Sequence, residues 1–329
     1  MRIISAFSRF QRRVFAVCVL VGISIVVVQP RLVQYVRGEL DTSTVSVLPA
    51  QADSSTISLL PPQYPVVVRR PENTSLADPF VTAKAAVAMD VTSGALLYEQ
   101  HAFESRPPAS VTKLMTALVA RDAYYLDQVL QTDLGAKSAG TVIDYSQGEE
   151  QTVRSLLKAS LIQSGNDAAE VLAARYPGGS SAFVEAMNKR ARDMGLESTF
   201  FENPSGLDSP QHTMSVRDIS LVFAQALQDP FLRETLMESQ AYVLDSSGTV
   251  GRTLHNTNQL LWAEYVLAGK TGTTEAAGQV LTTLVLVDGH EVIITVAGSD
   301  DRYTDTIALY RWLEQAYTWV DQDEFNLLH

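Results

Sequence analysis

A serine and a lysine stand three residues apart at the head of an apolar stretch. Ser110 and Lys113 belong to the segment PPASVTKLMTAL, residues 107–118. On an α-helix, positions i and i+3 share a face, so we expect the two side chains to project together from the first turn. The residues that follow are apolar almost all round, which predicts a buried helix. A buried lysine is costly unless something uses it. An N-cap at Ser110 with Lys113 reaching water is the alternative.

Two more short motifs follow along the chain. Ser164-Gly165-Asn166 closes the predicted helix VRSLLKASLIQ, and Lys270-Thr271-Gly272 ends the predicted strand EYVLAG. Simple helix capping by residues 164 and 166 is one alternative. The end of a phosphate-binding loop at 269–271 is another, but that motif needs a glycine where Glu264 stands. Three motifs in this order favour a common catalytic site over three coincidences.

In this order, Ser-X-X-Lys, Ser-X-Asn and Lys-Thr-Gly resemble the signatures of the penicillin-recognising serine acyltransferases. Longer stretches are similar to the low-molecular-mass penicillin-binding proteins, the serine-type D-alanyl-D-alanine carboxypeptidases and endopeptidases. These stretches are NDAAEVLA, FVEAMNKRARDMGLESTFFENPSGLD, HNTNQLLW, GKTGTTEAAGQ and DRYTDTIALYRWL. The resemblance covers about residues 78–320. It implies an enzyme without a cofactor that acts on peptidoglycan stem peptides outside the membrane and is inhibited by β-lactam antibiotics.

The resemblance also implies a role for each motif residue. Ser110 is the nucleophile, Lys113 the general base, and Ser164 a proton relay toward the leaving amine. Asn166 holds the acyl-side amide and Lys113. Lys270 also belongs to the catalytic residues and, with Thr271, would receive the terminal carboxylate. The other substrate-binding residues are Gly272, Thr273, whose N–H lies beside that of Ser110 in an oxyanion hole, and Arg302 at an outer carboxylate contact. For Arg302, an ion pair with Asp300, Asp301 or Asp305 is an equal alternative.

Lys113 can accept a proton only when it is neutral. Burial, the positive end of the helix dipole and the charge of Lys270 should all lower its pKa. The required change is about 3 pKa units, or about 4 kcal/mol, within the range known for buried lysines. No histidine is then needed, and none of the five histidines lies in a triad-like setting.

Charge and cysteine content exclude several classes of protein. The formal net charge is −12, although residues 1–37 contain arginines and no acidic residue. The remainder is therefore strongly acidic and repels phosphate backbones, which argues against nucleic-acid binding. Cys18 is the only cysteine, so no intramolecular disulfide and no cysteine-rich metal site can form. We expect no metal site.

The amino-terminal residues predict a membrane segment. Residues 14–28, VFAVCVLVGISIVVV, are uncharged and follow four arginines. We interpret residues 1–36 as a short cytoplasmic tip with a single-pass anchor, a removed signal peptide being the alternative. The arginine distribution places the body outside the cell membrane. Residues 37–77, rich in Ser, Thr and Pro, read as a spacer. The catalytic domain is expected over 78–321, with a tail at 322–329.

Local patterns predict the fold. AKAAVAMD and ALLYEQ flank a turn, and GQVLTTLVLV and EVIITVAG flank Asp288-Gly289, a strong hairpin signal. With the strand AEYVLAGKTG they make a five-stranded antiparallel sheet. Residues 111–240 are mostly helical by spacing, and a helix is expected in the stretch TDTIALYRWLEQAYTWV. The fold class is therefore α/β, a sheet flanked by helices with an inserted helical subdomain, similar to serine β-lactamases and D,D-transpeptidases.

Four functions stay open. We expect a D-alanyl-D-alanine carboxypeptidase, with a D,D-endopeptidase that cuts cross-links as the main alternative. The sequence ends soon after the last predicted helix, without the further β-domain of many such carboxypeptidases, which favours the endopeptidase. A serine β-lactamase needs a Glu-X-X-X-Asn motif, and FFENPSGLD lacks that spacing. A non-catalytic penicillin-sensing module would need a cytoplasmic signalling domain, and only about thirteen residues precede the anchor.

Overall fold

The structure, a computed structural model, describes residues 66–70, 75–134 and 138–320. The predicted anchor within residues 1–36 and the predicted tail at 322–329 lie outside these ranges, as does the predicted spacer up to residue 65. Among the described residues, no helix combines the length and the apolar character that crossing a membrane requires.

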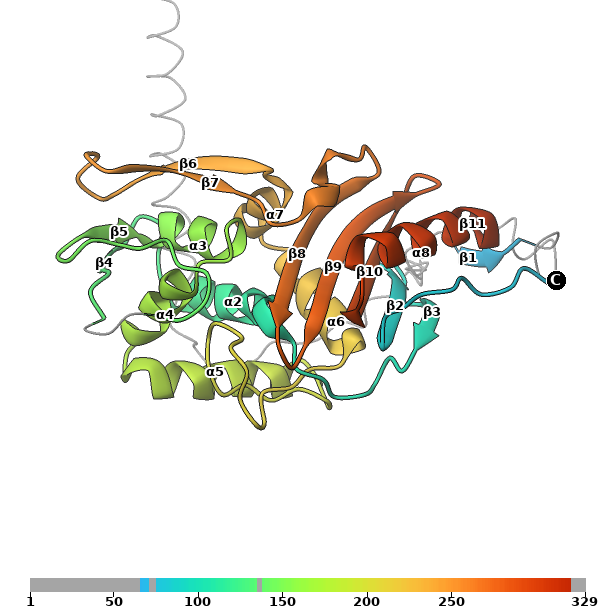
Figure 1. Cartoon of the computed structure of the whole chain (residues 1–329), viewed down its shortest axis with the longest axis horizontal. Coiled ribbons are helices and arrows are strands. Elements are labelled where there is room, and N and C mark those ends of the chain that lie inside the picture. Colours follow the sequence, from blue (N-terminus) through green and yellow to red (C-terminus); the bar gives the residue numbers. More distant parts are fainter. Residues whose placement is uncertain (1–65, 71–74, 135–137, 321–329) are drawn as a thin grey trace, which may run out of the picture. The chain divides into compact units, whose positions relative to one another are not determined.

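An antiparallel five-stranded sheet forms the centre of the main domain, as predicted (Figure 1). The two predicted hairpins lie side by side in it, and the third segment joins as an edge strand. The order is β3 (Leu96–Gln100), β2 (Ala85–Asp90), β10 (His290–Ser299), β9 (Gly278–Val287) and β8 (Val266–Thr274). The turn between β9 and β10 has positive φ at both Asp288 and Gly289, the geometry of a two-residue hairpin loop.

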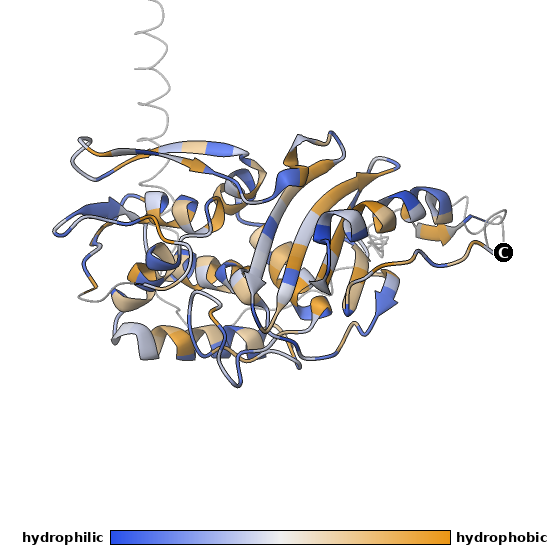
Figure 2. Ribbon diagram, in the orientation of Figure 1, coloured by the Kyte–Doolittle hydropathy of each residue, from blue (hydrophilic) through white to orange (hydrophobic). Residues whose placement is uncertain are grey.

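Both faces of the sheet are buried, because alternate residues of each strand point to opposite sides. Ala85 and Val87 of β2 belong to one apolar cluster, and Ala86 and Ala88 to a second. Helix α6 (Val216–Ala226) packs on the first face, and α8 (Arg302–Ala316) covers β9 and β10 on the other. Figure 2 shows the matching pattern, with hydrophobic residues along the strands and mixed colouring on the helices.

The helical subdomain holds the segments predicted from apolar spacing. They are α2 (Lys113–Ala123), α3 (Val153–Leu161), α4 (Asn166–Ala174) and α5 (Gly179–Asp193). One further helix, α7 (Pro230–Met237), was not predicted. Its signal is the Asp229-Pro230 pair: the Asp229 side chain accepts from two backbone N–H groups, and proline occupies the first turn. Helix α2 contacts α3, α4, α5 and α6, so the predicted buried helix is the centre of this subdomain.

Three small two-stranded sheets were not predicted either. They are β1 (Val66–Arg69) with β11 (Tyr317–Val320), β4 (Val129–Gln131) with β5 (Glu150–Thr152), and β6 (Gln240–Leu244) with β7 (Gly251–His255). Strand β1 lies inside the range predicted as a spacer, yet it pairs in register with β11 after the last helix. The two ends of the described chain therefore meet at this small sheet.

Candidate active site

Ser110 lies on a short 3-10 helix rather than on the α-helix itself. The helix η2 spans Ala109–Thr112, and α2 begins directly after it at Lys113. Side chains at i and i+3 are eclipsed in a 3-10 turn, which brings Ser110 over Lys113 more directly than the predicted α-turn. Ala109 has a positive φ of 51°, an uncommon conformation for alanine. Ser110 is partly exposed, whereas Lys113 is fully buried.

The Lys113 amine is surrounded by three oxygen atoms. Its Nζ lies 2.8 Å from Ser110 Oγ, 2.7 Å from Asn166 Oδ1 and 2.5 Å from the Ser205 carbonyl oxygen. The last two atoms can only accept hydrogen bonds. A neutral amine has two protons and one lone pair, so it satisfies both acceptors and leaves the lone pair for the Ser110 hydroxyl. The geometry therefore fits a neutral lysine that accepts the serine proton.

Electrostatics favour the same protonation state. Burial lowers the pKa of Lys113 well below its ordinary value, and the positive charge of Lys270 lowers it further. The carboxylates of Glu170 and Asp167 act in the opposite direction and are weaker. Desolvation penalises the ammonium form because water no longer solvates it.

Ser164 and Lys270 form a second pair beside the first. Ser164 lies in the turn between α3 and α4 with a φ of 63°, a left-handed conformation that is rare for serine and common at functional sites. The Lys270 amine on β8 donates to Ser164 Oγ at 2.9 Å. Burial, with a smaller effect from the Arg302 charge, lowers the pKa of Lys270 to about 7. This amine can therefore carry or release a proton near neutral pH.

Strand β8 passes closely beside the nucleophile. A Cβ placed on Gly272 would lie 2.9 Å from the Ser110 backbone nitrogen and 2.9 Å from the Ala109 Cβ. Any side chain at this position would push the strand away, so glycine permits the approach. The backbone of the predicted oxyanion donor Thr273 follows directly on the same strand.

Arg302 reaches back from the start of α8 to the same strand. Its guanidinium donates to the Gly272 carbonyl at 2.8 Å and also bonds the Thr273 hydroxyl. Its Nε donates to Gln279 Oε1 at 2.9 Å. None of the ion pairs found among the described residues involves Arg302, although its charge and that of Asp301 act on each other's pKa.

The loop 203–208 contributes atoms that the sequence analysis did not single out. The sequence analysis gave this segment no role at the site, yet the Ser205 carbonyl accepts from Lys113. Gly206 has a φ of 84°, and a Cβ there would lie 2.0 Å from the Ala109 carbonyl oxygen. The segment ENPSGLD carries a local signal, because Asn203 Oδ1 accepts from three backbone N–H groups of its own loop. The contact between the Ser205 carbonyl and Lys113 could not be predicted from the segment, because the two residues are 92 positions apart.

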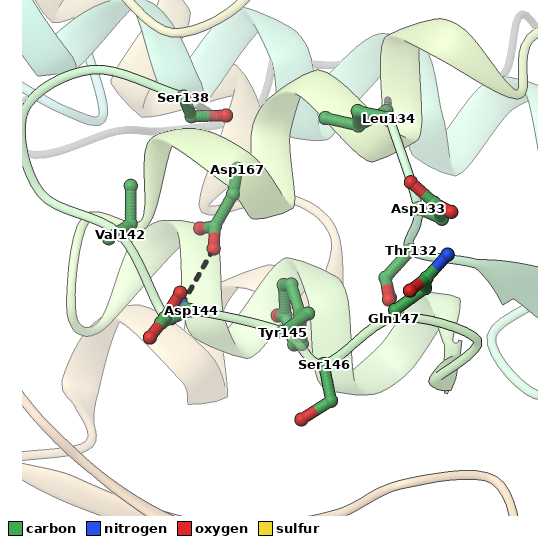
Figure 3. Close-up of a pocket in the computed structure, with 10 residues that line it drawn as sticks. All are labelled: Thr132, Asp133, Leu134, Ser138, Val142, Asp144, Tyr145, Ser146, Gln147 and Asp167. Atoms are coloured by element: carbon green, nitrogen blue, oxygen red, sulfur yellow. Dashed lines mark hydrogen bonds between the residues drawn. The ribbon is translucent and has the colours of Figure 1, made fainter. Parts of the chain in front are cut away.

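Asp167 fastens a second loop to the start of α4. Its carboxylate accepts from the backbone nitrogen of Ile143 at 2.9 Å and from that of Asp144 at 2.9 Å, the bond drawn in Figure 3. Asn166 Nδ2 donates to the Ala139 carbonyl at 2.6 Å. This bond to Nδ2 fixes the Asn166 amide so that its oxygen faces Lys113. The loop 139–144 is thus a support for Asn166.

A cavity of about 680 Å³ lies beside this loop (Figure 3). Asp144, Tyr145 and Asp167 line it, and none of its lining residues is a predicted site residue. Burial raises the pKa of Tyr145 well above its ordinary value. The cavity is therefore separate from the residues around Ser110. Asp167 links the two, because it lines the cavity and also holds the loop that supports Asn166.

His212 is buried behind the nucleophile turn. Its Nδ1 accepts from the Glu202 backbone N–H at 3.1 Å, so Nε2 carries the proton and donates to Thr112 Oγ1 at 2.8 Å. Burial lowers the pKa of His212 to about 4, which keeps the ring neutral. Within the described ranges it has no hydrogen bond to Ser110. No cluster of three metal-ligating side chains was found in the part of the chain that the structure describes.

Known proteins are similar to this chain in sequence and architecture. The sequence profile of the D-alanyl-D-alanine carboxypeptidase family matches residues 72–301. The D-alanyl-D-alanine endopeptidase of Escherichia coli strain K12 is 30% identical over 249 residues, which cover 73% of this chain and 80% of that protein. The D-alanyl-D-alanine carboxypeptidase DacF of Bacillus subtilis strain 168 is 30% identical over 243 residues, 72% of this chain. This chain spans only 62% of the length of that carboxypeptidase.

A solved structure extends the likeness to the fold. The crystal structure of the Streptomyces K15 DD-transpeptidase matches with a TM-score of 0.68 and 26% sequence identity, over 72% of this chain and 98% of that one. The predicted fold class, an antiparallel sheet flanked by helices with an inserted helical subdomain, is confirmed by this match and by the strand order.

Proposed function

The chain belongs to the D-alanyl-D-alanine carboxypeptidase family, and from that premise we propose that it removes the terminal D-alanine from peptidoglycan stem peptides through an acyl-enzyme on Ser110. The observation that carries this proposal is the contact of 2.8 Å between the partly exposed Ser110 hydroxyl and the fully buried Lys113 amine. β-Lactam antibiotics are expected to acylate the same hydroxyl and to inhibit the enzyme.

In the proposed acylation, neutral Lys113 takes the hydroxyl proton while Ser110 Oγ attacks the carbonyl carbon between the two D-alanines. Negative charge develops on the carbonyl oxygen, where the backbone N–H groups of Ser110 and Thr273 are proposed to stabilise it. Loss of one such donor typically costs about 3 kcal/mol. The close approach of β8 to the Ser110 nitrogen at Gly272 supports this placement.

The proton must next reach the nitrogen of the leaving D-alanine. The Ser164 hydroxyl is the proposed relay, because it is bonded to Lys270, whose pKa of about 7 lets it exchange a proton near neutrality. The C–N bond then breaks, free D-alanine departs, and an ester remains on Ser110. Water then attacks the ester carbonyl while Lys113 accepts its proton. Lys113 passes this proton to Ser110 Oγ as the ester bond breaks, and the shortened peptide leaves with a new carboxylate.

Substrate recognition is proposed to centre on the terminal carboxylate. Lys270, the Thr271 hydroxyl and the Arg302 guanidinium lie along β8, and the cationic groups complement an anion. Asn166 is proposed to hold the acyl-side amide of the peptide as well as Lys113. Thr273 contributes its backbone N–H, and its hydroxyl is held by Arg302.

Cross-link cleavage is the second candidate, because a D,D-endopeptidase breaks the same kind of bond. It is favoured by the relative named D-alanyl-D-alanine endopeptidase, of which this chain covers 80%, against 62% of the carboxypeptidase. The β-lactamase and the penicillin-sensing module have no such support. We propose that residues 1–36 anchor the protein in the cell membrane and that the domain 78–321 works on the extracytoplasmic side.

Labelling with a fluorescent penicillin tests the nucleophile. The purified protein should form a covalent adduct that survives denaturing electrophoresis, and Ser110→Ala should abolish it. Ser105→Ala, at an exposed serine nearby, is the matched control and should label normally. Labelling that persists in Ser110→Ala would reject the assignment. Digestion of purified muropeptides then separates the two candidates, since loss of one D-alanine and splitting of a dimer give different product masses.

A further inference from the structure

Thr257 lies against the Thr271 hydroxyl, in a segment to which the proposed reaction assigns no role. The two Oγ1 atoms are 2.5 Å apart, a short hydrogen bond between hydroxyl groups. Thr271 is buried at 5% exposure, whereas Thr257 is half-buried. Neither hydroxyl has another hydrogen-bond partner among the described residues.

The two hydroxyl groups have two protons between them, and their mutual bond uses one. The other proton remains available to an acceptor on a bound substrate. If Thr271 is to donate to a carboxylate, its oxygen must receive the proton of Thr257, because a hydroxyl group has only one proton to give. With Thr257 as the donor, the chain runs from Thr257 to Thr271 to the anion, and each bond polarises the next.

We propose that Thr257 is a positioning residue that directs the Thr271 proton toward the terminal carboxylate of the substrate. The inference rests on the proposed function, in which Thr271 binds that carboxylate. Thr257 lies outside the three motifs. The inference predicts that Thr257 affects only substrates that carry a negative charge at the end bound by Thr271.

The backbone around Thr257 is held in place from two sides. Its N–H donates to the Ile162 carbonyl at 3.2 Å, just before the turn that carries Ser164. Its own carbonyl accepts from the Tyr303 hydroxyl at 2.9 Å, on the helix that begins with Arg302. Thr257 therefore sits where the second motif, the third motif and the start of α8 meet. Because the backbone of Thr257 is fixed by these bonds, its hydroxyl group loses little conformational freedom when an anion binds.

The test compares benzylpenicillin with its methyl ester, which lacks the negative charge. Second-order acylation rate constants are measured for the wild type, Thr257→Val and Thr257→Ser. Valine keeps the shape and removes the proton, while serine keeps the proton. We expect Thr257→Val to slow acylation by the free acid about 3- to 10-fold, to leave the ester within about twofold, and Thr257→Ser to restore the acid rate. Thermal unfolding checks the fold, and Thr257→Ala replaces Thr257→Val if valine disturbs it.

Three results would overturn the inference. They are an unchanged acid rate in Thr257→Val, an equal loss for acid and ester, and a Thr257→Ser variant as slow as the valine variant. A wild-type protein that reacts with neither compound would instead reject the proposed function, and this inference with it. The two failures are thus distinguishable from the wild-type measurement alone.

Discussion

Acid should destabilise the protein through His212. The folded state keeps this imidazole neutral, with a pKa of about 4, because the ring is buried and its Nδ1 already accepts from the Glu202 N–H. In the unfolded chain the pKa returns to about 6.5. Between these values the unfolded chain binds a proton that the folded protein excludes, so the free energy of unfolding falls as the pH falls. The stabilisation is complete above pH of about 6.5 and is lost toward pH of about 4.

The size of the effect follows from the same two pKa values. One pKa unit corresponds to about 1.4 kcal/mol, so lowering the pH from about 7.5 to about 4.5 should remove about 2–3 kcal/mol through this residue. Urea unfolding of the purified protein at several pH values measures the loss, and His212→Gln isolates it. Glutamine does not titrate, so the variant should be less stable at the higher pH and should approach the wild type at the lower pH. Parallel stability curves for the two proteins would refute a buried neutral histidine.

Two further predictions concern the amine beside the nucleophile. Lys113→Met fills a similar volume without a lone pair, so we expect penicillin acylation to fall by about 10²- to 10⁴-fold while thermal unfolding still shows a folded protein; acylation within about tenfold of the wild type would exclude Lys113 as the base. Asp167→Asn removes a negative charge that raises the pKa of Lys113, so the acidic limb of the acylation rate should move to lower pH. The same substitution weakens the bonds to the backbone of Ile143 and Asp144, so the free energy of unfolding in urea should fall by about 1–2 kcal/mol. An acidic limb of the acylation rate that moved to higher pH would contradict the predicted effect on Lys113.

Much of the sheet could be predicted from the sequence, because its signals are local. The Asp288-Gly289 turn with its flanking strands specifies β9 and β10 within about twenty residues. The helices α2 to α6 likewise follow from apolar spacing along single segments. Helix α7 was missed although the Asp229-Pro230 signal was present. The sheet of β1 and β11 was missed because its pairing joins segments at opposite ends of the described chain. The β6–β7 hairpin is local and was missed all the same.

Some residues of the candidate site could be predicted from the sequence and others could not. Ser110, Lys113, Ser164, Asn166 and the Lys270 strand could be named in advance, since residue types at fixed spacing carry the pattern. The chemistry of Lys113 also depends on the Ser205 carbonyl, and the proton of Thr271 on Thr257. Every residue has a carbonyl oxygen and every threonine a hydroxyl, so the sequence does not indicate which of them contribute to the site.

The sequence by itself determined which side chains stand in each motif and which local elements carry them. Only the tertiary structure decided that Lys113 has no contact with water, that two acceptors take its protons, and that β8 lies against the nucleophile at Gly272. The physical reason is that a pKa and a hydrogen-bond direction depend on every atom within a few ångströms, and these atoms come from segments far apart along the chain.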